Sequence, residues 1–323
     1  MSVPFIARLI ELGIGKEASH GAGAAASFWI PKVSFDHDVK IERAVSAASF
    51  GNISTETTGY VTEQYAQGKL ESEIRDKSFG LFLLALFGTS SPAVYSGAYK
   101  HTLTLQNDNA HDSLCLSYKD SIGSLLFKMA MIDEMTIEVS AGEIAKFSAS
   151  FMSKLATDST ALTPAYVQEN RFTSKHASLK IADSSGQLTA ASATSIKRFS
   201  LTISKNLIKT SVLGSVEPED ILNTAFKITG RIELDYKNRT IRDYMLAGKI
   251  KALRFDLVNS DRTIGTTNPS FRIDLPKVQF YEWEKSGGLD DIVGEAVNFT
   301  AFFDPINNQI WSDAYLINET ASY

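Results

Sequence analysis

The sequence GKLESEIRDKSF at residues 68–79 recurs as GRIELDYKNRTI at residues 230–241, and most positions keep their charge sign or apolar character. A second pair of segments follows in the same order. GEIAKFSASF at residues 142–151 matches GEAVNFTAFF at residues 294–303. The spacing between the copies is 162 residues for the first pair and 152 for the second. Two ordered matches with a small change of spacing predict an internal duplication.

The duplication predicts how the chain is divided into domains. The matched halves run from about residue 30 to 155 and from about residue 170 to 320. Residues 155–174 are rich in Thr, Ala and Ser without a clear period, so we interpret them as a linker. We therefore expect a first domain with an N-terminal arm over residues 1–165 and a second domain over residues 166–323.

Strict alternation of apolar and polar residues predicts a strand in the second copy. Between residues 226 and 236 the even positions are apolar or Gly and the odd positions are polar or charged. This pattern is typical of an antiparallel strand with one face on a core. The first copy keeps the parity, with Leu70 and Ile74 inward, because the spacing of 162 is even. Gly68 and Gly230 lie inside these strands, which indicates a bulge or a close backbone approach.

A short apolar segment follows each of these strands. Residues 78–87 and 240–247 begin with Ser or Thr, whose hydroxyl is expected to accept from free N–H groups of a first helical turn. The residues expected to be buried where each helix meets its sheet are Phe79, Leu84, Ile241 and Leu246. The predicted fold class is mainly β, with two tandem antiparallel β-sandwich domains that each carry one short α-helix.

The composition argues against several classes of function. Lys plus Arg number 32 and Asp plus Glu number 37, which gives a net charge of −5 without any Lys/Arg tract. Tight binding to nucleic acid or anionic lipid needs clustered cations, so neither is expected. The single cysteine, Cys115, fits a chain that folds in a reducing cytosol. We expect no signal peptide, because Arg8 and Glu11 interrupt the apolar N-terminus, and no membrane span.

The sequence predicts no catalytic residues, no cofactor and no metal site. Asp-His-Asp at residues 36–38 would point its side chains to alternate faces of an extended chain, which favours a solvated edge over a metal site. Cys115 lies in an alternating apolar stretch, without a residue evidently placed to activate its thiol. GAGAAA at residues 21–26 fits G-x-G-x-x-A, but a buried strand before it and a helix after it are both lacking.

The order of several short segments resembles a known family. GKLESEIRDKSFGLFLLALFG at residues 68–88 is followed by YKHTLTL at 99–105, SLCLSY at 113–118 and MAMIDEMTIEVSAGEIAKFSASF at 129–151. These segments resemble the major tail tube proteins of long-tailed bacteriophages, especially those in which one chain carries two tube domains. The N-terminal LIELGIGKEASHGAGAAASFWIPKVSF at residues 9–35 is similar to the opening arm of that family. The resemblance covers nearly the whole chain.

This resemblance implies a structural protein of the virion tail. In that family tube domains form rings, the rings stack into a tube, and DNA passes through the channel at infection. A chain with two tube domains would close a six-domain ring with three copies. Further implied partners are the tape measure protein, the tail terminator and baseplate or distal tail proteins, with assembly in the host cytoplasm. The rival interpretation is a β-sandwich surface adhesin or carbohydrate-binding module, which would usually carry an export signal.

The resemblance also implies loose roles for particular residues. The segment over residues 1–31 would contact an adjacent ring or subunit, and the duplicated strands would belong to the channel wall. The implied channel-wall strand residues are Leu70, Glu71, Ile74, Ile232, Glu233 and Tyr236, and those of the inter-ring arm are Phe5, Leu9 and Ile14. Because the chain is acidic and has no basic run, we expect DNA to pass without specific binding.

Overall fold

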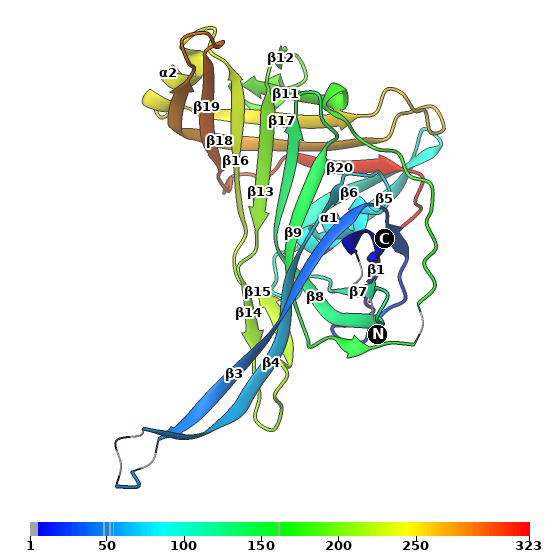
Figure 1. The fold of residues 1–323 in the computed structure, drawn as a ribbon. Helices are drawn as coiled ribbons and strands as arrows, with labels where there is room; N and C mark the ends of the chain where they lie inside the picture. The colour runs from blue at the N-terminus through cyan, green and yellow to red at the C-terminus, as the bar shows by residue number, and fades with distance from the viewer. Residues whose placement is uncertain (1–5, 48, 52, 54, 161) are drawn as a thin grey trace.

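A computed structural model of the chain describes residues 6–47, 49–51, 53, 55–160 and 162–323 (Figure 1). Within them the chain is mainly β, with antiparallel strand pairs and two α-helices, as the alternating sequence predicts. Eighteen strands join one hydrogen-bonded network, and β14 and β15 form a separate ribbon.

The N-terminal elements are η1 (Ala7–Leu9), β1 (Glu11–Lys16), β2 (Phe28–Ile30), β3 (Val33–Ala47), β4 (Glu56–Glu73), α1 (Phe79–Phe87), β5 (Gly88–Tyr95), β6 (Ala98–Leu105), β7 (Leu114–Lys119), β8 (Ser124–Ser140), β9 (Lys146–Ser153) and β10 (Thr157–Asp158). The C-terminal elements are η2 (Ser174–His176), β11 (Ala177–Ala182), η3 (Ser185–Gln187), β12 (Ala193–Thr194), β13 (Arg198–Ser204), β14 (Leu207–Thr210), β15 (Asp220–Asn223), β16 (Lys227–Asp235), α2 (Thr240–Leu246), β17 (Ile250–Val258), β18 (Ser270–Ser286), β19 (Gly294–Ala301) and β20 (Asp313–Asn318).

Two runs of four strands have the same order. In the N-terminal run β3 pairs with β4, β4 with β9, and β9 with β8. In the C-terminal run β13 pairs with β16, β16 with β19, and β19 with β18. In both runs the strand that precedes the short helix therefore lies second, between a strand from before it and one from after the helix.

The glycines inside these strands mark a close approach and not a bulge. Gly68 pairs with Phe151 across β4 and β9, and Gly230 pairs with Phe299 across β16 and β19. A Cβ added to Gly68 would lie 2.8 Å from the Phe151 ring, and one added to Gly230 would lie 2.4 Å from the Phe299 ring. Each ring thus lies directly over its glycine, where only a hydrogen fits.

This register corrects the second sequence match. The equivalent residues are Phe151 and Phe299, which are 148 residues apart, whereas the sequence match placed Phe151 on Phe303 at a spacing of 152. Phe303 lies beyond the end of β19 and is half exposed. The spacing of 162 in the first match agrees with the register, because it places Gly68 on Gly230.

The two runs are joined edge to edge. β8 pairs with β13 over seven residues, from Glu134–Ser204 to Ser140–Arg198. The inward side chains of both strands are buried in one core that extends through both runs. The C-terminal strand β20 also pairs with β6, so a strand of the expected second domain completes a sheet of the first.

The two short helices lie in different surroundings. All nine residues of α1 are buried, and α1 contacts β1, β5, β6 and β8. It ends at Gly88, whose φ of 88° is the left-handed conformation that favours glycine. The expected hydroxyl caps are absent from both described helix starts. The Ser78 hydroxyl instead donates to Glu169 Oε2, 3.1 Å away, and Thr240 is the first residue of α2.

Candidate functional site: the open face of the sheet

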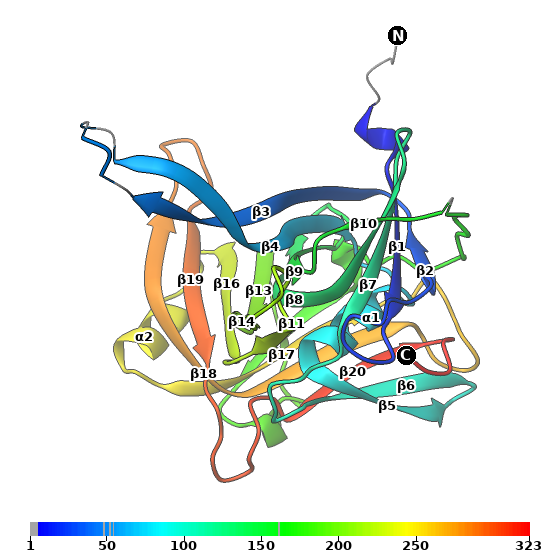
Figure 2. The same ribbon diagram turned by 90° about the horizontal axis from the view of Figure 1, so that it is seen from below.

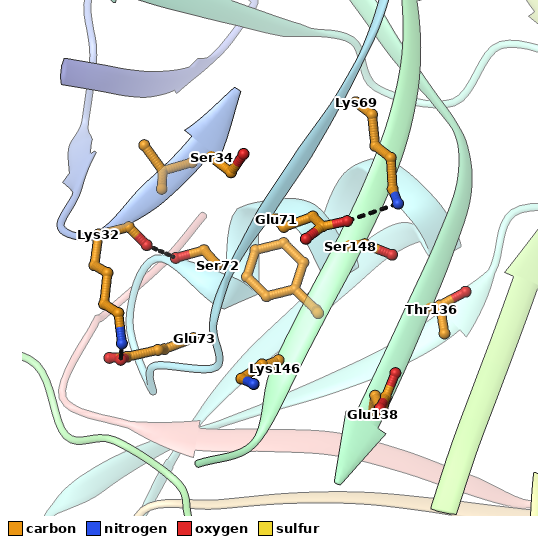
Figure 3. Close-up of a pocket in the computed structure, with 12 residues that line it drawn as sticks. Lys32, Ser34, Lys69, Glu71, Ser72, Glu73, Thr136, Glu138, Lys146 and Ser148 are labelled. Carbon is orange, nitrogen blue, oxygen red and sulfur yellow. Dashed lines mark hydrogen bonds and ion pairs between the residues drawn. The ribbon is translucent and has the colours of Figure 1, made fainter. Parts of the chain in front are cut away.

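The joined runs have one apolar face on the core and one polar face open to solvent. The open face carries the polar residues that alternate with the buried ones on each strand. Figure 3 shows part of it, a hollow in which Lys69 and Glu71 of β4 lie beside Ser148 of β9 and Thr136 and Glu138 of β8. The sheet edges and this polar face, not an enclosed pocket, are therefore the candidate functional surfaces.

Most cations on the open face are held by neighbouring carboxylates. The pairs, with their N···O distances, are Lys40–Asp38 (3.2 Å), Lys69–Glu71 (2.7 Å), Arg198–Glu138 (2.6 Å), Arg231–Glu284 (2.7 Å) and Arg231–Glu233 (3.2 Å). Such exposed pairs add little to stability. They do mean that these cations already have an anionic partner, so a phosphate must displace a carboxylate to bind them.

The strands expected to form a channel wall contribute two kinds of side chain. Glu71 and Glu233 lie on the open face, where each is paired with a cation. Leu70, Ile74 and Ile232 are buried in the core, as their parity in the sequence predicts. Their side chains pack in the core on the opposite side of the sheet from the open face.

Tyr236 does not lie on either face of β16, which ends one residue earlier. Its ring packs against Trp283 of β18 with the centroids 5.9 Å apart, and Lys285 Nζ lies 4.9 Å from the Tyr236 ring centroid. Tyr236 therefore belongs to a small cluster at the end of the C-terminal run.

The expected helix–sheet core is found at three of its four positions. Phe79, Leu84 and Ile241 are buried, but Leu246 is 69% exposed, so the expectation for Leu246 was wrong. The reason is the position of α2. This helix has seven residues and packs mainly against β18, whereas α1 is enclosed by four strands.

The expected inter-ring arm is largely folded into the protein. Phe5 lies outside the described residues. Leu9 ends the 3-10 helix η1 and is half exposed, and η1 projects from the body in Figure 2. Ile14 is wholly buried, because β1 pairs with both β2 and β7. The side chain of Ile14 is therefore not available for the contact with an adjacent ring that was expected of it.

A buried carboxylate explains how this N-terminal segment is fixed. Glu17 accepts hydrogen bonds from the backbone N–H groups of Gly21 (2.8 Å), Gly23 (2.9 Å) and Met129 (3.1 Å). The Ser113 hydroxyl donates to it at 2.6 Å. The GAGAAA segment that resembles a dinucleotide motif thus binds Glu17 of the same chain through its backbone. The same carboxylate holds the end of β1 against β8 and the start of β7.

A fully buried lysine was missed in the sequence. Lys205 Nζ donates to the carbonyl oxygen of Ala85 in the last turn of α1, 2.7 Å away. Burial lowers the pKa of Lys205 to about 7, although Asp133 and Asp112 partly oppose this effect. The available signal was parity, because residue 205 continues the inward series of Phe199, Leu201 and Ile203.

This lysine predicts an unusual dependence of stability on pH. Between about pH 7 and pH 10.5 the unfolded chain holds a proton on Lys205 that the native chain lacks, so this residue makes the free energy of unfolding increase with pH. We expect the difference in Tm, Lys205→Met minus the parent, to decrease as the pH is raised from 7 to 9.5. Scanning calorimetry checks this, with exposed Lys227→Met as the control. Equal pH slopes for parent and Lys205→Met would contradict it.

The remaining candidates for chemistry do not form a site. Cys115 is buried, and burial raises the pKa of its thiol. In the described part of the chain, no group of three or more His, Cys, Asp or Glu side chains is arranged to hold a metal ion. Nor does any helix in the described ranges have the length and apolar character needed to cross a membrane.

Comparison with known proteins identifies the family. The family model described as phage tail tube protein matches residues 7–301 of the 323. No curated protein matches the chain closely enough to add to this. The matched residues contain both four-stranded runs and the β8–β13 joint. The chain belongs to the phage tail tube protein family and is a structural component of the virion tail.

Proposed function

We propose that copies of this chain form stacked rings, and that the resulting tube conducts phage DNA into the host. The observation that carries the proposal is the repeated four-stranded run, with a phenylalanine over a strand glycine at the same place in both runs. Its occurrence twice in a member of the tail tube family supports two tube domains produced by duplication.

Two similar domains in one chain suggest the stoichiometry of the ring. The β8–β13 joint places the two runs edge to edge in a head-to-tail manner. Repetition of a head-to-tail contact closes into a ring when its rotation allows. Three copies would supply six similar domains. The two faces of such a ring remain free to stack, and the two ends of the tube would meet the tape measure, terminator and baseplate or distal tail proteins.

Exposed apolar side chains on the β3–β4 hairpin support assembly. This hairpin projects far from the body of the protein (Figure 1). Its large apolar side chains with at least two fifths of their surface exposed include Val39, Ile41, Val45, Tyr60 and Val61. Large apolar side chains exposed together on one projecting element are typical of interaction surfaces. We propose that a second copy of the chain covers them in the tube.

Electron microscopy and mass measurement test the ring. We expect concentrated purified protein to show rings or tubes with a central channel, and light scattering of isolated rings to give the mass of three chains. Size-exclusion chromatography at low concentration gives the monomer as reference. A ring of six chains, or a protein that stays monomeric at every concentration, would overturn the proposal.

We expect the open face to line the channel and to repel DNA weakly. Its carboxylates are Asp36, Asp38, Glu42, Glu71, Glu134, Glu138, Glu233, Asp235, Glu282 and Glu284, and its cations are Lys40, Lys69, Lys146, Arg198, Lys227 and Arg231. The carboxylates outnumber the cations. Screening over roughly 10 Å at 0.1 M salt would keep the repulsion short-ranged, so DNA could slide without being held.

Charge reversal on this face should create DNA binding. In gel-shift titrations at near-physiological salt we expect the parent to show no micromolar affinity for duplex DNA. The variant Glu71→Lys/Glu134→Lys should bind more tightly, with an affinity that falls steeply as salt rises. Micromolar binding by the parent with the same salt dependence would contradict a passive channel.

A further inference from the structure

Two strand edges of the chain have hydrogen-bonding groups free for another strand. Among the described residues β3 pairs only with β4, so its other edge is open along Val33–Ala47. β17 pairs with β18 only as far as Gln279, which leaves residues 280–286 of β18 with β19 as their single partner. Open strand edges of this length are ready templates for pairing with another chain.

The joint inside the chain shows how such edges fit together. Where β8 meets β13, Met135 lies opposite Ile203 and Ile137 lies opposite Leu201, and all four side chains are buried. On the open face the hydroxyls of Thr136 and Thr202 lie 2.8 Å apart, within hydrogen-bond distance. The chain therefore contains one edge contact of this kind, and its register is known.

The strand registers show which free edges correspond to this joint. Gly68 pairs with His37 of β3, and Gly230 pairs with Leu201 of β13, so His37 is equivalent to Leu201. Ala149 and Val297 are also equivalent, because they are 148 residues apart, as Phe151 and Phe299 are. Ala149 pairs with Met135 of β8, and Val297 pairs with Trp283 of β18, so Met135 is equivalent to Trp283. β3 is thus equivalent to β13, and the free part of β18 is equivalent to the part of β8 that forms the joint.

We propose that the free edge of β18 pairs antiparallel with the free edge of β3 in a second copy of this chain. The register of the internal joint then places Trp283 opposite Val39 and Ser286 opposite Asp36. The inference rests on the proposed function, and it specifies which edges meet and at which residues.

The side chains at these edges fit the contact. Trp283 and Val39 form an apolar pair where the internal joint has Met135 and Ile203, and Val39 is half exposed in the free chain. On the open face Lys40 of one copy lies beside the register shift at Tyr281–Trp283 of the other, where Glu282 supplies a carboxylate of opposite charge. The contact between copies is more polar than the internal joint, as suits a chain that must also exist as a free subunit.

Cysteine cross-linking tests the register. In Asp36→Cys/Ser286→Cys the two thiols lie on directly opposite residues of neighbouring copies, about 5 Å apart at Cα and within the range of a disulfide. In the control Asp38→Cys/Ser286→Cys the residues are diagonal, roughly 7–8 Å apart, and outside the usual range. Buried Cys115 is common to both variants and to the parent.

Assembled protein is oxidised and run on a non-reducing gel beside electron micrographs of the same sample. We expect covalent dimers and trimers for the first variant, about tenfold more than for the control. Rings without this cross-link, or with equal cross-linking in the control, would overturn the edge assignment and leave the proposed function standing. A parent chain that forms no rings would overturn both.

Discussion

Replacing Leu84 with alanine should lower the free energy of unfolding by about 2–5 kcal/mol, the usual cost of a buried leucine side chain. Leu84 is 3% exposed and lies in α1, which four strands enclose. Leu246 occupies the matching place in α2 but is 69% exposed. Leu246→Ala changes a side chain that is mostly in solvent, so we expect a change within about 0.5 kcal/mol.

Chemical denaturation of both variants and the parent measures this difference, because the shift of midpoint at constant slope gives the change in stability. The two substitutions are chemically identical and serve as controls for each other. Equal losses for Leu84→Ala and Leu246→Ala would show that α2 packs against its sheet as α1 does. Loss of stability at Leu246 only in the assembled ring would instead indicate that a neighbouring copy covers α2.

The contrast between these helices shows what the sequence could predict. Alternation identified the strands and their inward faces correctly, because burial of one face of a sheet imposes a period of two on the residues themselves. Glu71 and Glu233 could therefore be assigned to the exposed face. The exposure of Leu246 depends on which strands lie around α2, and these come from segments without any local signal in the helix.

The misplaced second match has a similar origin. The letters of residues 142–151 and 294–303 agree best at a spacing of 152, but strand register follows backbone hydrogen bonds and ring packing. Insertions or deletions in the connections shift the letters without shifting the strands. The register shift in β8 lies between Ile132 and Glu134, and that in β18 lies between Tyr281 and Trp283. Counted from the equivalent phenylalanines of β9 and β19, the shift in β18 comes one residue later along the strand.

The N-terminal segment shows the limit of motif reasoning. Residues 21–26 fitted a cofactor motif only by composition, and their place is set by a single carboxylate that accepts from Gly21 and Gly23. The partners of Glu17 at Ser113 and Met129 are about a hundred residues away in the sequence. No local sequence pattern indicates such a contact, so the sequence did not predict that Glu17 and β1 are buried within the chain.

Alanine at Gly68 or at Gly230 should destabilise the protein through overpacking. A Cβ at Gly68 would lie 2.3 Å from the carbonyl oxygen of Asp36, and one at Gly230 would lie 2.4 Å from that of Ser200. Both contacts are to backbone, which cannot turn aside as a flexible side chain can. Overpacking of this kind typically costs about 1–3 kcal/mol, and we expect each variant to be at or above that range.

Gly123→Ala is the matched control, since a Cβ there would meet no atom within 4 Å. The two strand glycines lie in different four-stranded runs with no shared partner, so their effects should add within about 0.5 kcal/mol in the double variant. Similar single losses that add would mean that both runs depend on the same glycine–phenylalanine contact, as two copies of one domain should. A loss at Gly68 with none at Gly230 would contradict that equivalence, and with it the structural basis for counting six domains in a ring of three chains.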